Sequence, residues 1–173
     1  MTAEKVPIAG SVCQMIDPNE FRRVMGHFAS GVAVVTTLRP DGHPCGLTVS
    51  AVSSVSLSPT LLLVCVDRTS RSHDCIITSG FFAVNVLAED GGDAVARRFA
   101  GRGEADKFAG VAWTAAETGA PLLAETTAWM DCRVAGSLPG GDHTIFLGEV
   151  VAADTRPAAP LVYFRGGFGR LVP

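Results

Sequence analysis

Apolar and polar positions near the start of the chain repeat at the spacing of a helix. The apolar members of this repeat are Phe21, Val24, Met25, Phe28 and Ala29. They follow Asp17-Pro18-Asn19-Glu20, which offers an N-cap, a proline at the first helical position and an acidic residue three positions after the cap. The pattern predicts a short helix that ends before Gly31, with one apolar stripe that must pack on another surface.

Beyond this helix the pattern is mostly that of extended strands. Apolar or β-branched runs predict strands over residues 32–38, 61–66, 81–87, 129–138, 143–153 and 161–164. Helical patterns are short, and they cover residues 70–77 and 92–100. Many strands with few helices indicate an antiparallel barrel or sandwich better than a parallel α/β sheet.

Residues 46–59 (GLTVSAVSSVSLSP) form the most unusual segment, which we expect to pair with residues 32–38 as a hairpin around Pro40-Asp41-Gly42. The segment reads as a strand, yet it carries five serines and a threonine, on both faces. A buried strand would be almost continuously apolar, and a half-buried one would alternate. Two interpretations stand: an exposed edge strand, or a strand whose small hydroxyl side chains let a flat polar ligand approach.

Composition restricts the class of protein. A chain of 173 residues suits one domain, which we expect to span residues 17–173 after a flexible arm over residues 1–16. The formal net charge of -3 gives no basic field for nucleic acid, and no apolar run reaches the about 20 residues that span a membrane. The N-terminus lacks a signal peptide, and five widely spaced cysteines look like reduced packing residues, so we expect a cytoplasmic protein.

The segment Asp67-Arg68-Thr69-Ser70-Arg71-Ser72 leads from a predicted strand into a helix start. It brings hydroxyls, two guanidiniums and free backbone N–H groups together, as phosphate binding requires. The same residues are explained equally well if Thr69 or Ser70 simply caps the helix and the two arginines are solvated. Gly101-Arg102-Gly103 follows a helix and lacks a third glycine in register, so we reject it as a dinucleotide fingerprint.

His143 is the histidine with the most site-like setting, because it follows a Gly-Gly-Asp turn and begins a strand. It could stack on a planar ligand or contact it through a hydrogen bond, or it could simply satisfy its own turn. The four histidines are scattered without zinc-like spacing, so we expect no metal site. No arrangement of residues indicates a catalytic nucleophile or a pair of catalytic carboxylates.

Five motifs in this order make the chain resemble the flavin reductase-like family, the small reductase components of two-component flavin monooxygenases. The motifs occupy residues 21–36, 46–59, 82–87, 106–108 and 141–150. The resemblance implies an antiparallel split β-barrel that binds FMN, mainly β with a few short flanking helices. It also implies a homodimer with flavin near the subunit interface.

The resemblance further implies which residues bind the two nucleotides. Thr48, Val49, Ser50 and Ala51 would line the flavin ring and ribityl chain, with Ser54 nearby. Asp67, Arg68, Ser70 and Ser72 would lie along the ribityl and phosphate end, and Lys107 close to the flavin. His143 would contact the nicotinamide nucleotide, and Phe168 belongs to a tail that closes over the site in relatives.

The activity implied is reduction of FMN or FAD by NADH or NADPH, with the reduced flavin passed to a partner monooxygenase. Hydride transfer between two cofactors needs orientation and exclusion of water, so no catalytic side chain is expected. Two alternatives stay open. The protein could hold a prosthetic flavin tightly and oxidise its own substrate, or it could be a non-catalytic binding module on the same barrel.

Overall fold

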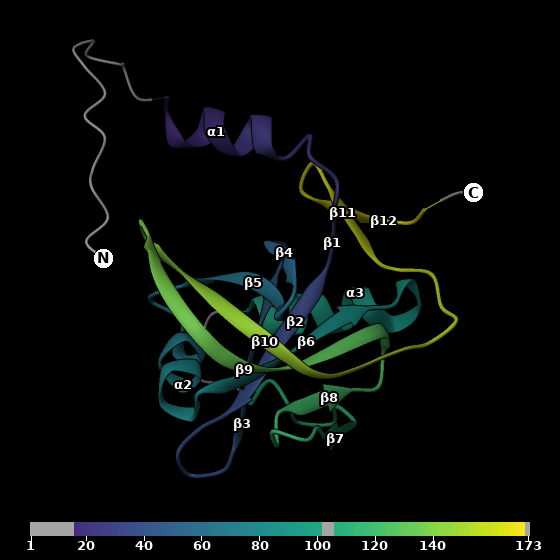
Figure 1. Ribbon diagram of the computed structural model, residues 1–173. Helices are drawn as coiled ribbons and strands as arrows, with labels where there is room; N and C mark the ends of the chain where they lie inside the picture. The colour runs from purple at the N-terminus through teal and green to yellow at the C-terminus, as the bar shows by residue number, and fades with distance from the viewer. Residues whose placement is uncertain (1–15, 102–105, 172–173) are drawn as a thin grey trace, which may run out of the picture.

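The computed structural model describes residues 16–101 and 106–171, and Figure 1 shows their arrangement. The predicted arm over residues 1–16 therefore lies outside the described residues except for its last position, and so does most of Gly101-Arg102-Gly103. No described helix has the length and the apolar character that crossing a membrane would require.

One antiparallel sheet forms the body of the molecule. It contains β2 (Ala33–Leu38), β3 (Pro44–Val49), β4 (Val52–Leu57), β5 (Thr60–Asp67), β6 (Phe81–Leu87), β9 (Thr126–Gly140) and β10 (His143–Thr155). The strand order is β3-β2-β6-β9-β10-β5-β4, so β3 and β4 lie at opposite edges. Only two residues separate β3 from β4, which forces the edges together and closes the sheet into a barrel. The predicted antiparallel barrel is confirmed.

The sequence predicted a single strand for the hydroxyl-rich segment. This prediction is wrong, because the segment forms two strands on opposite edges of the sheet. β3 pairs with β2 in the expected hairpin, and β4 pairs with β5. Between them the chain turns at Ser50 and Ala51, and the Ala51 carbonyl accepts a hydrogen bond from the Cys65 amide at 3.1 Å. Hydroxyl residues therefore occur at both odd and even positions of the segment, because β3 and β4 belong to different edges of the sheet.

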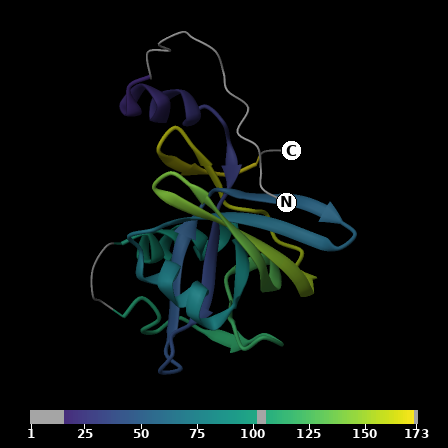
Figure 2. The same ribbon diagram turned by 60° about the vertical axis from the view of Figure 1, so that its left-hand side comes forward.

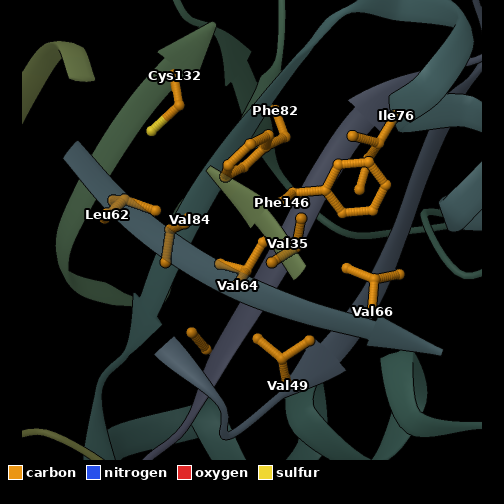
Figure 3. Close-up of a cluster of buried hydrophobic side chains, with 11 residues drawn as sticks. Val35, Val49, Leu62, Val64, Val66, Ile76, Phe82, Val84, Cys132 and Phe146 are labelled. Atoms are coloured by element: carbon orange, nitrogen blue, oxygen red, sulfur yellow. The ribbon is translucent and has the colours of Figure 1, made fainter. Parts of the chain in front are cut away.

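The barrel interior holds a cluster of aliphatic and aromatic side chains, shown in Figure 3. Phe82 and Phe146 are among its largest fully buried members. They are surrounded by β-branched residues from neighbouring strands, among them Val35, Val64 and Val84. A second cluster forms where α3 (Glu89–Ala100), in the region of the helical pattern over residues 92–100, covers the sheet through Val95 and Phe99.

Short strands complete the fold. β1 (Ser30–Gly31) pairs with β11 (Val162–Phe164), which pairs with β12 (Gly167–Gly169) in a small separate sheet. β7 (Trp113–Ala115) and β8 (Pro121–Leu123) form another. Of these strands the sequence predicted only β11, because strands of two or three residues depend on distant partners and carry little pattern of their own.

The predicted N-terminal helix is α1 (Pro18–Met25), capped by the Asp17 side chain, which accepts the Asn19 amide at 2.8 Å. Its apolar stripe does not pack as expected, since no residue of α1 is buried. Phe28, just beyond the helix, is 73% exposed. Both views place α1 apart from the barrel, above the β11–β12 hairpin (Figures 1 and 2). Within the described part of the chain, the stripe is therefore an exposed apolar face.

Candidate functional site

The break between β3 and β4 forms one side of a polar surface at the end of the barrel. Ser50 and Ala51 are both exposed there. The Ser50 hydroxyl makes no hydrogen bond to any described residue, so it is available to a ligand. The bond from Cys65 to Ala51 holds this break beside β5, two residues before that strand ends.

The end of β5 and the start of α2 (Arg71–Ser79) form the next part of the surface. The Asp67 carboxylate accepts hydrogen bonds from the Thr69 amide and hydroxyl, both at 2.8 Å, and thereby fixes the loop. Ser70 caps α2, because its hydroxyl oxygen accepts the His73 amide at 3.2 Å. The cap by Ser70 is therefore present, and the exposed Arg68 guanidinium is left without a partner among the described residues.

The turn between β9 and β10 lies beside this loop. His143 begins β10 and is paired in register with Asp67 on β5, and the Arg68 amide donates to the Asp142 carbonyl at 3.1 Å. The Asp142 carboxylate hydrogen-bonds Nδ1 of His143 at 2.7 Å, which lowers the pKa of that carboxyl group. Nε2 of His143 makes no hydrogen bond to a described residue. The histidine is thus oriented by Asp142, with its other nitrogen free.

Lys107 approaches the same region from the segment that follows α3. Its ammonium group donates to the Phe99 carbonyl at 2.8 Å, near the C-terminus of α3. Burial lowers the pKa of Lys107, and the positive charge of Arg71 lowers it further. A phosphate near these two cations would relieve this electrostatic penalty, because an opposite charge favours the ionised lysine.

Three predicted residues direct their side chains at other parts of the protein. Val49 is a member of the barrel core, so it can offer only its backbone to a ligand. The Thr48 hydroxyl donates to the Ala96 carbonyl at 2.7 Å, which ties β3 to α3. Ser72 is buried, with its hydroxyl 3.3 Å from the Cys45 sulfur. These residues hold β3, α2 and α3 together beneath the polar surface.

Two other predicted residues, Ser54 and Phe168, lie on β4 and β12. Ser54 lies on β4, four residues after Ser50, and it pairs with Leu62 on β5, five residues before Asp67. Phe168 lies on β12, where the Arg97 guanidinium sits 5.1 Å from its ring centre. The structure brings most of the other predicted residues together at one end of the barrel, and the roles of Ser54 and Phe168 stay predictions.

His73 is a positioning residue that the sequence did not reveal. It is buried, and its Nε2 lies 2.9 Å from the Thr144 hydroxyl on β10, next to His143. Its ring also packs against Phe146, with 5.6 Å between ring centres. The contact locks the start of α2 to the start of β10. Its only sequence signal was its place near a helix start, which is too common to be specific.

The donor set suits an anionic, hydroxyl-rich planar ligand. The serine hydroxyl, the arginine and the lysine can donate to a ribityl chain and a phosphate. The His143 side chain is 41% exposed, so it could contact a second planar group. Within the described residues no group of three or more His, Cys, Asp or Glu residues could hold a metal ion. The residues present therefore fit a flavin nucleotide.

Comparison with known proteins places this fold and site in a family. The flavin reductase-like domain model matches residues 25–171, which is most of the chain. This protein belongs to that family, as its sequence motifs indicated.

Curated relatives are similar over nearly the whole chain. The reductase component of 4-nitrophenol 4-monooxygenase/4-nitrocatechol 2-monooxygenase of Rhodococcus opacus is 46% identical, covering 96% of this chain and 88% of the relative. A flavin reductase (NADH) of Kitasatospora aureofaciens is also 46% identical, covering 90% of this chain and 83% of the relative.

Solved structures share the same fold. Nitrilotriacetate monooxygenase component B from Mycobacterium thermoresistibile superposes with a TM-score of 0.85 at 37% identity, covering 90% of this chain and 87% of the other. The NADH:FAD oxidoreductase SgcE6 of Streptomyces globisporus, in complex with NAD and FAD fragments, gives 0.84 at 39% identity, covering 93% and 98%. The likeness confirms the split-barrel fold.

Proposed function

We propose that this protein is an NADH-dependent flavin reductase that supplies reduced flavin to a partner monooxygenase. The observation that carries the proposal is the meeting of Ser50, Arg68, Lys107 and His143 at one end of a barrel that belongs to this family. Relatives whose names state an NADH:flavin activity or a monooxygenase reductase component support it.

The chain's own residues bind and orient the two nucleotides. Ser50 and the backbone at Ala51 contact the flavin, while Arg68 and Lys107 hold phosphate groups. His143 positions the nicotinamide side through its free Nε2. When both nucleotides are bound, the nicotinamide supplies a hydride from C4 and the flavin accepts it at N5. The protein contributes close stacking and exclusion of water, and no side chain exchanges a proton.

The flavin acts as a substrate that enters and leaves. Its proposed binding surface is exposed, and it is formed by single hydroxyls and cations at loop ends. FAD and FMN both carry the phosphate that Arg68 and Lys107 would bind, and we propose that the protein accepts either. We also propose a cytoplasmic location, which the free thiols of Cys45, Cys65, Cys75 and Cys132 support.

The function is tested by following NADH oxidation with purified protein, with and without added flavin. We expect rapid oxidation only when FMN or FAD is present, and slower oxidation when NADPH replaces NADH. NADH oxidation that proceeds equally well without flavin, or fails with every flavin, would exclude a flavin reductase.

We predict that His143→Ala weakens the nicotinamide side of the site. Loss of one contact costs about 1–2 kcal/mol, so KM for NADH should rise, or flavin reduction slow, by about tenfold. Flavin affinity should change little. Stopped-flow reduction at varied NADH, beside a flavin titration of the same variant, measures both quantities.

Two results would contradict this role. Failure of flavin binding with unchanged NADH kinetics would assign His143 to the flavin. No change in either would make it a turn residue. Asp142→Asn serves as the comparison, because it keeps the shape of the turn while it weakens the hydrogen bond that orients the histidine.

We propose that the protein is a homodimer that uses the exposed apolar stripe of α1. Phe21, Val24 and Met25 are each at least half exposed, and large apolar residues gathered on one face mark interaction surfaces. Sedimentation at micromolar concentration should therefore give a dimer, and Phe28→Glu should shift it toward monomer by placing charges in the interface.

The matched control for the dimer is Ile77→Glu on α2, which changes an apolar residue that is 59% exposed and lies away from α1. This variant should sediment like the unmodified protein. A monomeric unmodified protein at micromolar concentration would refute the dimer.

A further inference from the structure

A basic cleft lies between α1 and the β11–β12 hairpin, the pair of elements set apart above the barrel in Figure 1. Its volume is about 460 Å³. The residues that line it include Asn19, Arg22, Arg23, His27, Tyr163 and Arg165. Three guanidiniums and one imidazole thus face the same space, and no carboxylate is among the lining residues.

Two of the three guanidiniums have no compensating charge. Arg23 is neutralised by Glu20, whose carboxylate lies 2.5 Å away. Arg22 donates to the amide oxygen of Asn19 at 3.0 Å, which is a neutral partner. The Arg165 side chain has no hydrogen bond or ion pair with any described residue. In a chain of net charge -3, this cleft is therefore a local positive site.

Arg165 also has an unusual backbone. Its φ is 49° and that of Gly166 is 83°, so both residues of the β11–β12 turn are left-handed. Two-residue hairpins of this kind favour Asn-Gly, and a long side chain is uncommon at a positive φ. The Arg165 amide donates to the Gly26 carbonyl at 2.8 Å, which fixes the turn against the end of α1. Uncommon backbone conformations gather at functional sites, so the Arg165 side chain is a candidate for binding a ligand.

We infer that this cleft binds the phosphate groups of a nucleotide. Guanidiniums form paired hydrogen bonds with phosphate oxygens, and the His27 and Tyr163 rings offer flat surfaces for the rest of the ligand. The volume of about 460 Å³ lies within the usual range of small-molecule pockets. The inference rests on the proposed function, because flavin nucleotides and NADH supply such phosphates.

ADP binding to the full-length protein, measured by isothermal titration calorimetry, tests the inference. Arg165→Asn is the sharpest variant, because asparagine suits the turn while the charge is lost. We expect it to weaken ADP binding about tenfold, and Arg22→Gln to do so to a similar degree. Arg133→Gln removes an exposed arginine from β9 and should leave ADP binding unchanged. Added salt should weaken ADP binding to the unmodified protein.

KM values identify the source of the phosphate. If the cleft serves NADH, Arg165→Asn should raise the KM for NADH. If it serves FAD through its adenylate half, the KM for FAD should rise while that for FMN stays the same.

The inference is overturned if the unmodified protein does not bind ADP, or if Arg165→Asn binds ADP as tightly as the unmodified protein does. It is also overturned if the variant keeps its ADP affinity but loses binding to the monooxygenase, since the cleft would then contact a protein surface. ADP binding needs no turnover. A protein that binds ADP through these arginines yet reduces no flavin would therefore refute the proposed function alone.

Discussion

Ser50→Leu is expected to lower flavin affinity by at least about a hundredfold, a loss of about 3 kcal/mol of binding free energy. Ser50 lies at the break between β3 and β4, exposed and free of hydrogen bonds to described residues. A leucine there would occupy the space proposed for the flavin and remove a hydroxyl donor. Because the position contributes nothing to the core, stability should change by less than about 1 kcal/mol.

The control is Ser53→Leu, the same substitution at an exposed position three residues further along, on β4. It should leave flavin affinity close to that of the unmodified protein. Fluorescence titration of flavin, beside thermal unfolding, measures both variants. If Ser50→Leu lost stability without a specific loss of flavin affinity, the residue would belong to an ordinary edge strand.

Gly148→Val is expected to destabilise the fold by about 3 kcal/mol, the upper end of the usual cost of overpacking. Gly148 is buried on β10 at an irregularity in its pairing with β9. A Cβ atom added there would lie 2.5 Å from Cζ of Phe82 and 2.9 Å from Cβ of Cys132. Both neighbours are fully buried in the barrel core, so neither can move away without disturbing the packing.

For a chain of this size the loss corresponds to a melting temperature lower by about 6–12 °C, measurable by calorimetry. Gly136→Val on β9 is the matched control. Its added Cβ atom would come no closer than 3.9 Å to Leu147, which is ordinary contact. Equal stability of the two variants would show that the core accommodates a larger side chain at Gly148, which would contradict the prediction.

Capping residues and apolar runs in the sequence correctly predicted the helix start and the strand that depend only on neighbouring residues. Asp17 caps α1 as its position indicated, and β6 has the predicted bounds because its apolar run is buried through its length. The break at Ser50 could not be predicted, because it follows from the closure of the barrel by two distant edges. The lack of cover for the α1 stripe is likewise a property of the tertiary arrangement.

In the candidate site, too, features set by neighbouring residues could be predicted, and features set by distant residues could not. The Ser70 cap and the turn before His143 could be read from the sequence. Their proximity depends on the register that places His143 opposite Asp67, and antiparallel register between strands far apart in the chain leaves no local signal. The left-handed turn at Arg165 could not be predicted from the sequence, because arginine is not among the residues that favour such turns.

We propose that the flavin is a substrate of this barrel, which is released after its reduction. The most direct test mixes a small amount of protein anaerobically with NADH and a large molar excess of free FAD or FMN, follows the flavin absorbance, and then ultrafilters the mixture. We predict that the whole flavin pool bleaches and that reduced flavin passes the membrane. Bleaching limited to one flavin per protein, with that flavin retained, would contradict the claim and indicate a prosthetic group.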